Sequence, residues 1–298
     1  MTHPAGDGLV LVDKPAGITS HDVVARVRRF AGTKKIGHAG TLDPMATGLL
    51  LLGVNRATRL LTYLVGADKT YLATIRLGQS TVTDDAEGEI TASPGVDDID
   101  EAAVRAAVGG FLGDIEQVPS AVSAIKVDGR RSYARVRAGE DVRLAARPVT
   151  IHAFEVGSVS RTAADAGVGV LDVTVRVSCS SGTYVRALAR DLGTSLGSAG
   201  HLTALRRTAV GAFDVGEARS LEQLADGVVP LGLSDVARRV LPARELSAEE
   251  TVEVRYGRSV SASEADDVVA AFAPDGHVVA VLSDRGGQAR PVLVLDPA

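Results

Sequence analysis

The feature that most constrains this chain is a loop rich in glycine, proline and hydroxyl residues, at residues 34–48, which leads directly into an apolar run. Gly37, Gly40 and Gly48 permit backbone conformations that other residues avoid, and Pro44 pushes the residue before it, Asp43, out of the helical region. The following run, Leu49–Leu52, is too short to span a membrane and suits a buried strand. We therefore predict a stiff loop that presents one carboxylate and is anchored by a buried strand.

An aspartate before a proline is also common in ordinary turns, where its side chain caps its own backbone. The residues of the loop alone leave this alternative open for Asp43.

Periodic apolar residues predict the remaining elements. We expect a helix capped by Ser20, with Val23, Val24, Val27 and Phe30 on its buried side, and strands at residues 70–77 and 171–177. Further helices are expected near residues 99–112, closed by Gly113, and through residues 184–196. After residue 240, two strands around the turn Asp275-Gly276 and a third strand at residues 292–295 predict a small β domain.

Bulk properties are those of an enzyme-sized globular protein. The 298 residues, 45% of them hydrophobic, suffice for one large domain and one small one. No membrane span or export segment is visible, and the single cysteine, Cys179, excludes an internal disulfide, so we expect a cytoplasmic protein. Cys179 ends an alternating stretch, which favours a small core residue over a nucleophile.

No metal or cofactor is expected. The six histidines show no metal-ligand spacing, and no second cysteine could complete a site. The Asp43 loop lacks the Gly-Lys-Ser/Thr ending of a P-loop, and Gly167-Val-Gly169 lacks the third glycine of a dinucleotide fingerprint.

The charge is unevenly distributed along the chain. The formal net charge is -5, which argues against a nucleic-acid partner if it is considered globally. Basic residues nevertheless crowd residues 26–35 and 126–147, whereas acidic residues gather near 97–101 and 264–267. Such a distribution allows an acidic protein to present a basic surface to RNA, although basic runs can also be solvated helix faces.

Several motifs in order resemble those of the TruB family of tRNA pseudouridine synthases. The stretch Gly37–Gly48, Gly-His-Ala-Gly-Thr-Leu-Asp-Pro-Met-Ala-Thr-Gly, is similar to the family signature. Leu11–Asp22, Asp68–Tyr71, Pro119–Lys126 and Cys179–Arg186 resemble the other family motifs, so the similarity covers roughly residues 8–215. Ordered motifs over such a span are far more specific than one short pattern.

The resemblance implies an α+β fold. Its pseudouridine-synthase domain, expected at residues 1–238, has a mixed, mainly antiparallel central sheet flanked by helices and loops. An RNA-binding thumb is expected as an insertion at about residues 120–147, and a small β-rich, PUA-like domain at residues 239–298.

The resemblance also implies the activity and its residues. Asp43 is expected to be the catalytic aspartate, Arg186 its ion-pair partner and Tyr71 the group that stacks on the flipped uridine and removes its C5 proton. Substrate or RNA contacts are expected from His38, Lys14, Arg59, Tyr184, Lys126, Arg130, Arg131 and Leu205. The implied substrate is uridine 55 in the T-arm of tRNA, used by a monomer with no required protein partner and no cofactor.

Two rival functions remain open. One is an RNA-binding or tRNA-folding protein without catalysis, for which Asp43 would be dispensable. The other is an aspartate-dependent hydrolase acting on a nucleoside bond, which would release free uracil or leave abasic RNA.

Overall fold

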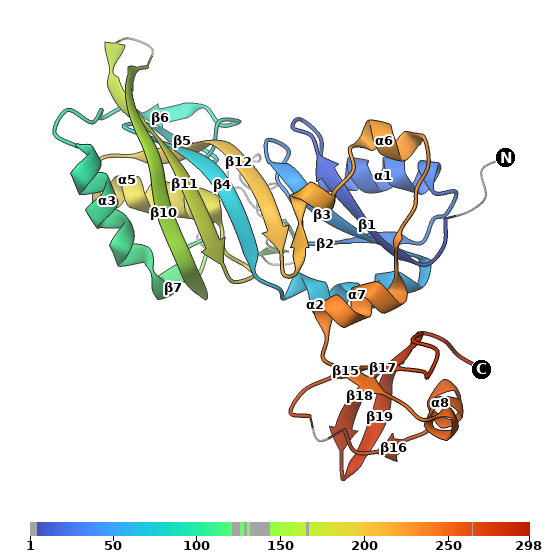
Figure 1. The fold of residues 1–298 in the computed structure, drawn as a ribbon. Coiled ribbons are helices and arrows are strands. Elements are labelled where there is room, and N and C mark those ends of the chain that lie inside the picture. The colour runs from blue at the N-terminus through green and yellow to red at the C-terminus, as the bar shows by residue number, and fades with distance from the viewer. Residues whose placement is uncertain (1–4, 121–125, 128–129, 132–143, 165–166, 264) are drawn as a thin grey trace. The chain divides into compact units, whose positions relative to one another are not determined.

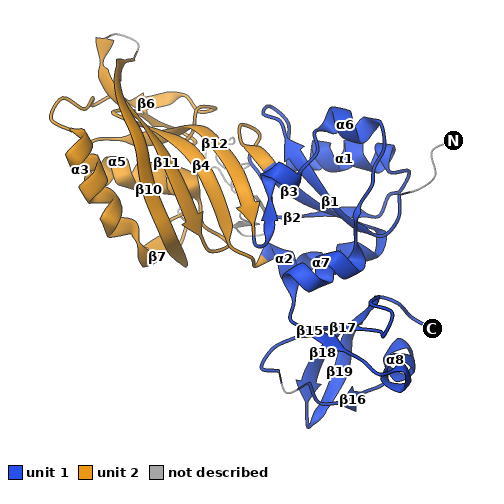
Figure 2. Cartoon of the chain, in the orientation of Figure 1, with its two compact units in different colours: residues 1–43, 49–65, 211–298 blue, residues 44–48, 66–210 orange. Residues whose placement is uncertain are grey.

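The computed structural model describes residues 5–120, 126–127, 130–131, 144–164, 167–263 and 265–298. Two compact units make up the chain (Figure 2). The first comprises residues 1–43, 49–65 and 211–298, and the second comprises residues 44–48 and 66–210. Figure 1 labels most of the helices and strands of both units.

The first unit packs helices on a sheet that contains the predicted buried strand. That strand is β3 (Thr47–Val54), which lies beside β1 (Gly8–Lys14) and pairs in antiparallel fashion with β2 (Ile36–Ala39); β14 (Leu231–Gly232) pairs with β1. Leu49–Leu52 are fully buried, as predicted. The other elements are η1 (Asn55–Arg59), α2 (Leu61–Val65), β13 (Phe213–Asp214), η4 (Val215–Glu217), α6 (Leu221–Ala225) and α7 (Leu233–Val240).

Helix α1 (Ser20–Phe30) forms as predicted, but its cap differs. Val23, Val24 and Val27 share an apolar cluster with residues of β3 and α6. The N-cap is Thr19 rather than Ser20, because Thr19 and Asp22 bond each other's backbone N–H in a capping box. The Ser20 hydroxyl is thereby available for a different contact, described below.

The second unit is built on five neighbouring strands, each of which pairs with the next in antiparallel fashion. In order these are β12 (Gly200–Val210), β4 (Lys69–Leu77), β11 (Gly169–Cys179), β10 (Arg147–Ala163) and β7 (Gly113–Gln117). Helix α5 (Val185–Ser195) packs on β12 and β4, and α3 (Glu101–Val108) packs on β10 (Figure 1). A small hairpin joins β5 (Ser80–Thr81) to β6 (Ile90–Ala92).

The sheet is mixed as well as mainly antiparallel, which confirms the expected fold class. Its parallel element in this unit is the pairing of Thr47 and Gly48 with Arg206 and Arg207 of β12. Both predicted alternating strands are confirmed as β4 and β11, and Cys179 is buried as a core residue.

The helix predicted at residues 99–112 is shorter than expected. It begins after the N-cap Asp100 and ends at Val108, followed by one 3-10 turn, η2 (Gly109–Phe111). The consecutive glycines at 109 and 110 weaken the helix before Gly113, which was predicted to close it. Gly113 instead starts β7 with a φ of 82°.

Only part of the predicted thumb falls within the described residues. β8 (Lys126–Val127) and β9 (Arg130–Arg131) pair as two short antiparallel strands. The remainder of the predicted insertion, apart from its two ends, lies outside the described residues. In the part of the chain that is described, no helix is long and apolar enough to cross a membrane.

The C-terminal residues form a separate sheet with its own core. Its order is β15 (Ala243–Glu245), β17 (Val269–Phe272), β18 (Val278–Arg285), β19 (Gln288–Val294) and β16 (Val260–Ser261), with α8 (Ala248–Arg255) against it. The hairpin around Asp275-Gly276 is confirmed, whereas the third strand starts at Gln288, earlier than predicted. The predicted domain boundary after residue 238 stays a prediction.

Candidate active site

The Asp43 loop is tied to helix α1 through the residue before the aspartate. The Ser20 hydroxyl donates to the Leu42 carbonyl at 3.1 Å and accepts from the Leu42 N–H at 2.9 Å. Both residues are buried, so the two hydrogen bonds fix the Leu42 peptide groups with little competition from water. Asp43 follows Leu42 directly and is half-buried.

The other end of the loop is fixed by a close backbone approach. Gly48 has a φ of 97°, and a Cβ at this position would lie 2.3 Å from the Arg207 carbonyl oxygen of β12. No other residue fits there without displacing backbone. Gly48 therefore fixes this end of the loop, and the predicted stiffness of the whole loop stays a prediction.

Lys14 and His38 belong to the first unit. The Lys14 ammonium is buried and donates to the carbonyls of Pro15, at 2.9 Å, and Ile18, at 2.8 Å, so it shapes the turn that precedes α1. His38 lies on β2, half-buried, with its ring edge-on to that of His21 at a centroid distance of 5.6 Å.

Tyr71 and Leu205 lie on neighbouring strands of the second unit. Tyr71 stands near the start of β4, in register with Val177 of β11 and Arg207 of β12, and is buried. Leu205 lies on β12 between two irregularities of the strand pairing, at residues 202–204 and 207–209. Each of these bulges re-aims the side chains that follow it.

Arg186 lies in the first turn of α5, as predicted, and is only 4% exposed. Its Nη1 is 3.4 Å from a carboxylate oxygen of Asp85 and donates to the Thr83 carbonyl at 2.8 Å. Asp85 is 2% exposed and also accepts from the Glu87 N–H. A buried guanidinium needs such partners, because an uncompensated charge in the interior is costly.

Two further buried groups have shifted pKa values. Burial lowers the pKa of Lys69 to about 8, and the nearby positive charge of Arg207 adds to this shift. Burial raises the pKa of the Cys179 thiol to about 11, so the thiol stays protonated at neutral pH. A protonated, buried thiol is a poor nucleophile, which agrees with the core role predicted for Cys179.

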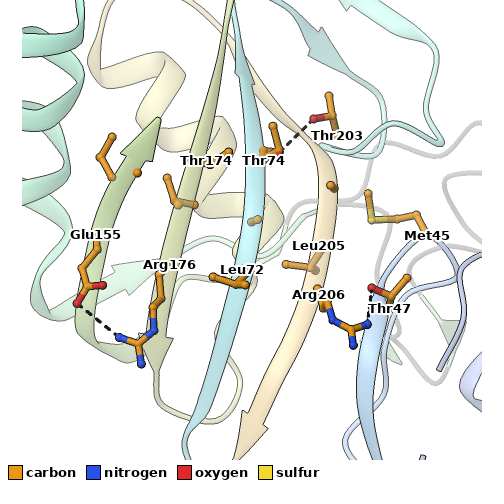
Figure 3. Close-up of a pocket in the computed structure, with 15 residues that line it drawn as sticks. Met45, Thr47, Leu72, Thr74, Glu155, Thr174, Arg176, Thr203, Leu205 and Arg206 are labelled. Carbon is orange, nitrogen blue, oxygen red and sulfur yellow. Dashed lines mark hydrogen bonds and ion pairs between the residues drawn. The ribbon is translucent and has the colours of Figure 1, made fainter. Parts of the chain in front are cut away.

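A pocket of about 650 Å³ lies over the sheet face formed by β10, β11, β4 and β12 (Figure 3). Leu205, Leu72 and Met45 are among its lining residues. Two hydrogen bonds also lie in its wall, from Arg176 to Glu155 and from Arg206 to Thr47, each 3.5 Å long. Tyr71, Tyr184 and Arg186 do not line it. Alternation along β4 explains this, since Leu72 and Thr74 point to the face opposite that of Tyr71.

The other predicted site residues lie at a helix end, in short strands or on the surface. Arg59 is exposed and donates from Nη1 to the Val294 carbonyl of β19 at 2.7 Å. Tyr184 is the N-cap residue of α5. Lys126, Arg130 and Arg131 are described only as backbone, in β8 and β9. The pairing of Arg186 with Asp43 and the phosphate contact of Arg59 stay predictions.

Several buried polar residues were not predicted from the sequence. Among them are Lys69, Asp85, Gln117 and Arg207, each at most 6% exposed. Lys69 lies inside a motif that was already noted, so it could have been selected. The others have no local signal, because only the fold shows that their side chains are buried. Among the described residues, no group of histidine, cysteine and acidic side chains could hold a metal ion.

Comparison with known families matches almost the entire chain. Residues 28–185 match the TruB family pseudouridylate synthase N-terminal domain, residues 186–245 match the tRNA pseudouridylate synthase B C-terminal domain, and residues 241–296 match the C-terminal domain of tRNA pseudouridine synthase II.

Individual relatives are similar over nearly their full length. A tRNA pseudouridine synthase B of Arthrobacter sp. strain FB24 is 61% identical over 98% of this chain and 97% of its own, and that of Thermobifida fusca strain YX is 56% identical over 97% and 98%. Among solved structures, a chain in the crystal structure of a Cbf5–Nop10–Gar1 complex superposes with a TM-score of 0.73 at 25% identity, over 97% of this chain and 85% of that one.

Proposed function

The chain belongs to the TruB family of pseudouridine synthases, and from this premise we propose that it converts uridine 55 in the T-arm of tRNA to pseudouridine. One observation carries the proposal: the chain is 61% identical, over nearly its whole length, to a protein named tRNA pseudouridine synthase B. In this proposal Asp43 is the catalytic carboxylate and Arg186 is its ion-pair partner.

The reaction sets the demands on the site. The glycosidic bond to N1 breaks, the base rotates while it is held, and a new bond forms from the sugar to C5, which then loses its proton while N1 gains one. No atom is added or lost overall, so a single ionised carboxylate can serve without a redox cofactor. Asp43 can attack C6 of the ring, attack C1' of the sugar, or remove the C2' proton after the base departs.

The other residues have supporting roles in this proposal. The uridine is extruded from the RNA into the site, stacked on Tyr71, which then removes the C5 proton. Arg186 pairs with Asp43 and keeps that carboxylate ionised and oriented. His38 contacts the RNA around the flipped base, Arg59 lies near a phosphate, and Lys126, Arg130 and Arg131 of the predicted thumb contact the stem-loop. Recognition depends mainly on stem-loop shape and phosphates.

Tritium release from tRNA labelled at uridine C5 tests the proposal. We expect release with the natural chain and none with Asp43→Asn, and the product nucleoside should have the retention and mass of pseudouridine. A transcript with cytidine at position 55 should release nothing if that position is the target. Tight tRNA binding without release by the natural chain would favour an RNA-binding protein, and free uracil would favour a hydrolase.

A further inference from the structure

Gln117 makes a two-point contact with the start of helix α5. It is 2% exposed, at the end of β7, and its carboxamide faces the main chain of Tyr184. Nε2 donates to the Tyr184 carbonyl at 3.1 Å, and Oε1 accepts from the Tyr184 N–H at 2.8 Å. A side-chain amide thus pairs with a peptide as a neighbouring strand would, with both groups satisfied.

This contact acts where α5 lacks a cap of its own. Tyr184 is the N-cap residue, and its side chain makes no capping hydrogen bond. Its carbonyl also accepts the first bond of the helix, from the Leu188 N–H at 3.2 Å. The first N–H groups of a helix have no partner within the helix, and here Gln117 holds both backbone groups of the residue from which α5 starts.

The helix start determines where Arg186 lies. Arg186 is two residues beyond Tyr184, and its guanidinium reaches Asp85 and the Thr83 carbonyl inside the unit. A small rotation or translation of the first turn would move this group relative to fixed partners. Geometry at this scale matters, because a displacement of about 1 Å can cost on the order of 100-fold in rate.

A second contact joins the same elements one turn later. Arg190 donates from Nη2 to the Val118 carbonyl at 2.7 Å, and its Nη1 is 3.2 Å from a carboxylate oxygen of Asp84. Val118 follows Gln117, and Asp84 lies between the two partners of Arg186. The end of β7, the loop at 83–85 and the first two turns of α5 are therefore one hydrogen-bonded network.

We propose that Gln117 is a positioning residue for Arg186, which holds the first turn of α5 so that the guanidinium keeps its place in the active site. This inference rests on the proposed function, in which Arg186 serves the reaction. Both polar groups of the Gln117 carboxamide bond to Tyr184, so its effect should be on the rate of the chemical step and not on tRNA binding.

Single-turnover measurements on the full chain test the inference. Gln117→Met should lower the rate of pseudouridine formation in unmodified tRNA by about 10- to 100-fold, with the tRNA Kd within about twofold of the natural value. Gln79→Met is the matched control, because Gln79 is equally buried in the same unit but its amide donates to Ser93. This control should lose a similar amount of thermal stability with little change in rate.

A double-mutant cycle separates positioning from a general loss of structure. In an Arg186→Lys background, Gln117→Met should cause little further loss, since the group that it positions is already impaired. Additive losses, or an unchanged rate in Gln117→Met, would overturn the inference while leaving the proposed function intact. No pseudouridine from the natural chain would instead refute the proposed function, and the inference with it.

Discussion

The ion pair between Arg186 and Asp85 joins two side chains that are almost completely buried. Asp85→Asn keeps the shape of the side chain but leaves the buried guanidinium short of a negative charge. Breaking one partner of a buried pair costs about 3–5 kcal/mol, so we expect a loss of this order in the free energy of unfolding, measured in urea. We also expect a fall in single-turnover rate.

The pair between Arg76 and Asp172 is the matched control for that variant. Its atoms are 2.7 Å apart, but both side chains are more than a quarter exposed. Asp172→Asn should cost about 1 kcal/mol or less, because water compensates an exposed pair. Equal losses in both variants would contradict the view that burial determines the importance of Asp85.

Lys69 predicts a specific pH dependence of stability. Burial lowers its pKa from 10.5 to about 8, so between these values the unfolded chain binds more protons than the folded chain. Stability from this group therefore rises as the pH increases from 8 to 10.5, and its cost is fully present below 8. Relative to Lys69→Met, the natural chain should gain thermal stability across this range, as calorimetry at several pH values can measure. A constant difference would contradict the lowered pKa.

At this scale the sequence was informative where chemistry and motif coincide. The family resemblance assigned roles to Asp43 and Arg186, which lie in its motifs, whereas Asp85 and Gln117 were not selected. An aspartate in Thr83-Asp-Asp85 resembles an ordinary turn residue, and a glutamine near a strand end is usually exposed. Their importance depends on burial by elements about 70 to 100 residues away, which no local pattern reveals.

Among the structural elements, helix α1 offers a comparison of two adjacent hydroxyl groups. Thr19→Ala removes the N-cap and should cost about 1 kcal/mol with no change in rate. Ser20→Ala leaves the buried N–H and carbonyl of Leu42 unsatisfied, which should cost about 1–3 kcal/mol. It should also slow pseudouridine formation about tenfold or more, since Asp43 follows Leu42. Equal rates in the two variants would show that this anchor does not position the loop.

Gly48 lies where β3 pairs with β12, so its substitution should lower the free energy of unfolding by more than backbone strain alone would. Gly48→Ala combines a positive φ with a Cβ 2.3 Å from the Arg207 carbonyl, whereas Gly17→Ala has a φ of 81° and open space around it. Strain at such a φ costs about 1 kcal/mol, and forcing β3 and β12 apart should raise the loss for Gly48→Ala to about 3 kcal/mol or more. Chemical denaturation of both variants measures the difference. If Gly48→Ala and Gly17→Ala lost similar amounts of stability, the backbone at Arg207 would have to shift at little cost.

Element types were predicted well, and their ends less well. Apolar periodicity identified α1, α5, β4 and β11, because burial of one face dominates their stability. The cap of α1 and the end of α3 were wrong, since each depends on one or two hydrogen bonds or on a glycine pair. Such a contact contributes only about 1 kcal/mol to stability. Sequence periodicity, which reflects the burial of a whole face, therefore does not locate it.

For the whole molecule, long-range pairing lay beyond the sequence. β4 pairs with β11 and β12, whose partner residues lie about 95 to 140 positions later in the chain. Alternation predicts that a strand has a buried face but not which strand lies beside it. The resemblance to a family supplied the type of sheet, mixed and mainly antiparallel, which the structure confirms, but not the order of its strands.

The chain has a formal net charge of -5 and is nevertheless proposed to bind tRNA, a polyanion, so binding must depend on local positive charge. Arg26 and Arg29 are exposed on α1, while neighbouring Arg28 donates to the Ile36 carbonyl. If the exposed pair contacts phosphates, each arginine releases about one counterion on binding. The plot of log K against log salt for tRNA should then be less steep by about 2 in Arg26→Gln/Arg29→Gln.

Arg105 provides the control for local charge. It is partly exposed, but its guanidinium is already committed to Glu101 and to the carbonyls of Val156 and Gly157. Arg105→Gln changes the net charge by the same amount per residue and should leave the salt dependence unchanged. If it lowered the slope as much per charge as the α1 variant, total charge would govern binding. A smaller slope only in the Arg26→Gln/Arg29→Gln variant would instead show that a locally basic surface binds tRNA despite the negative net charge. The salt dependence of the affinity reflects the number of phosphate contacts and not the net charge.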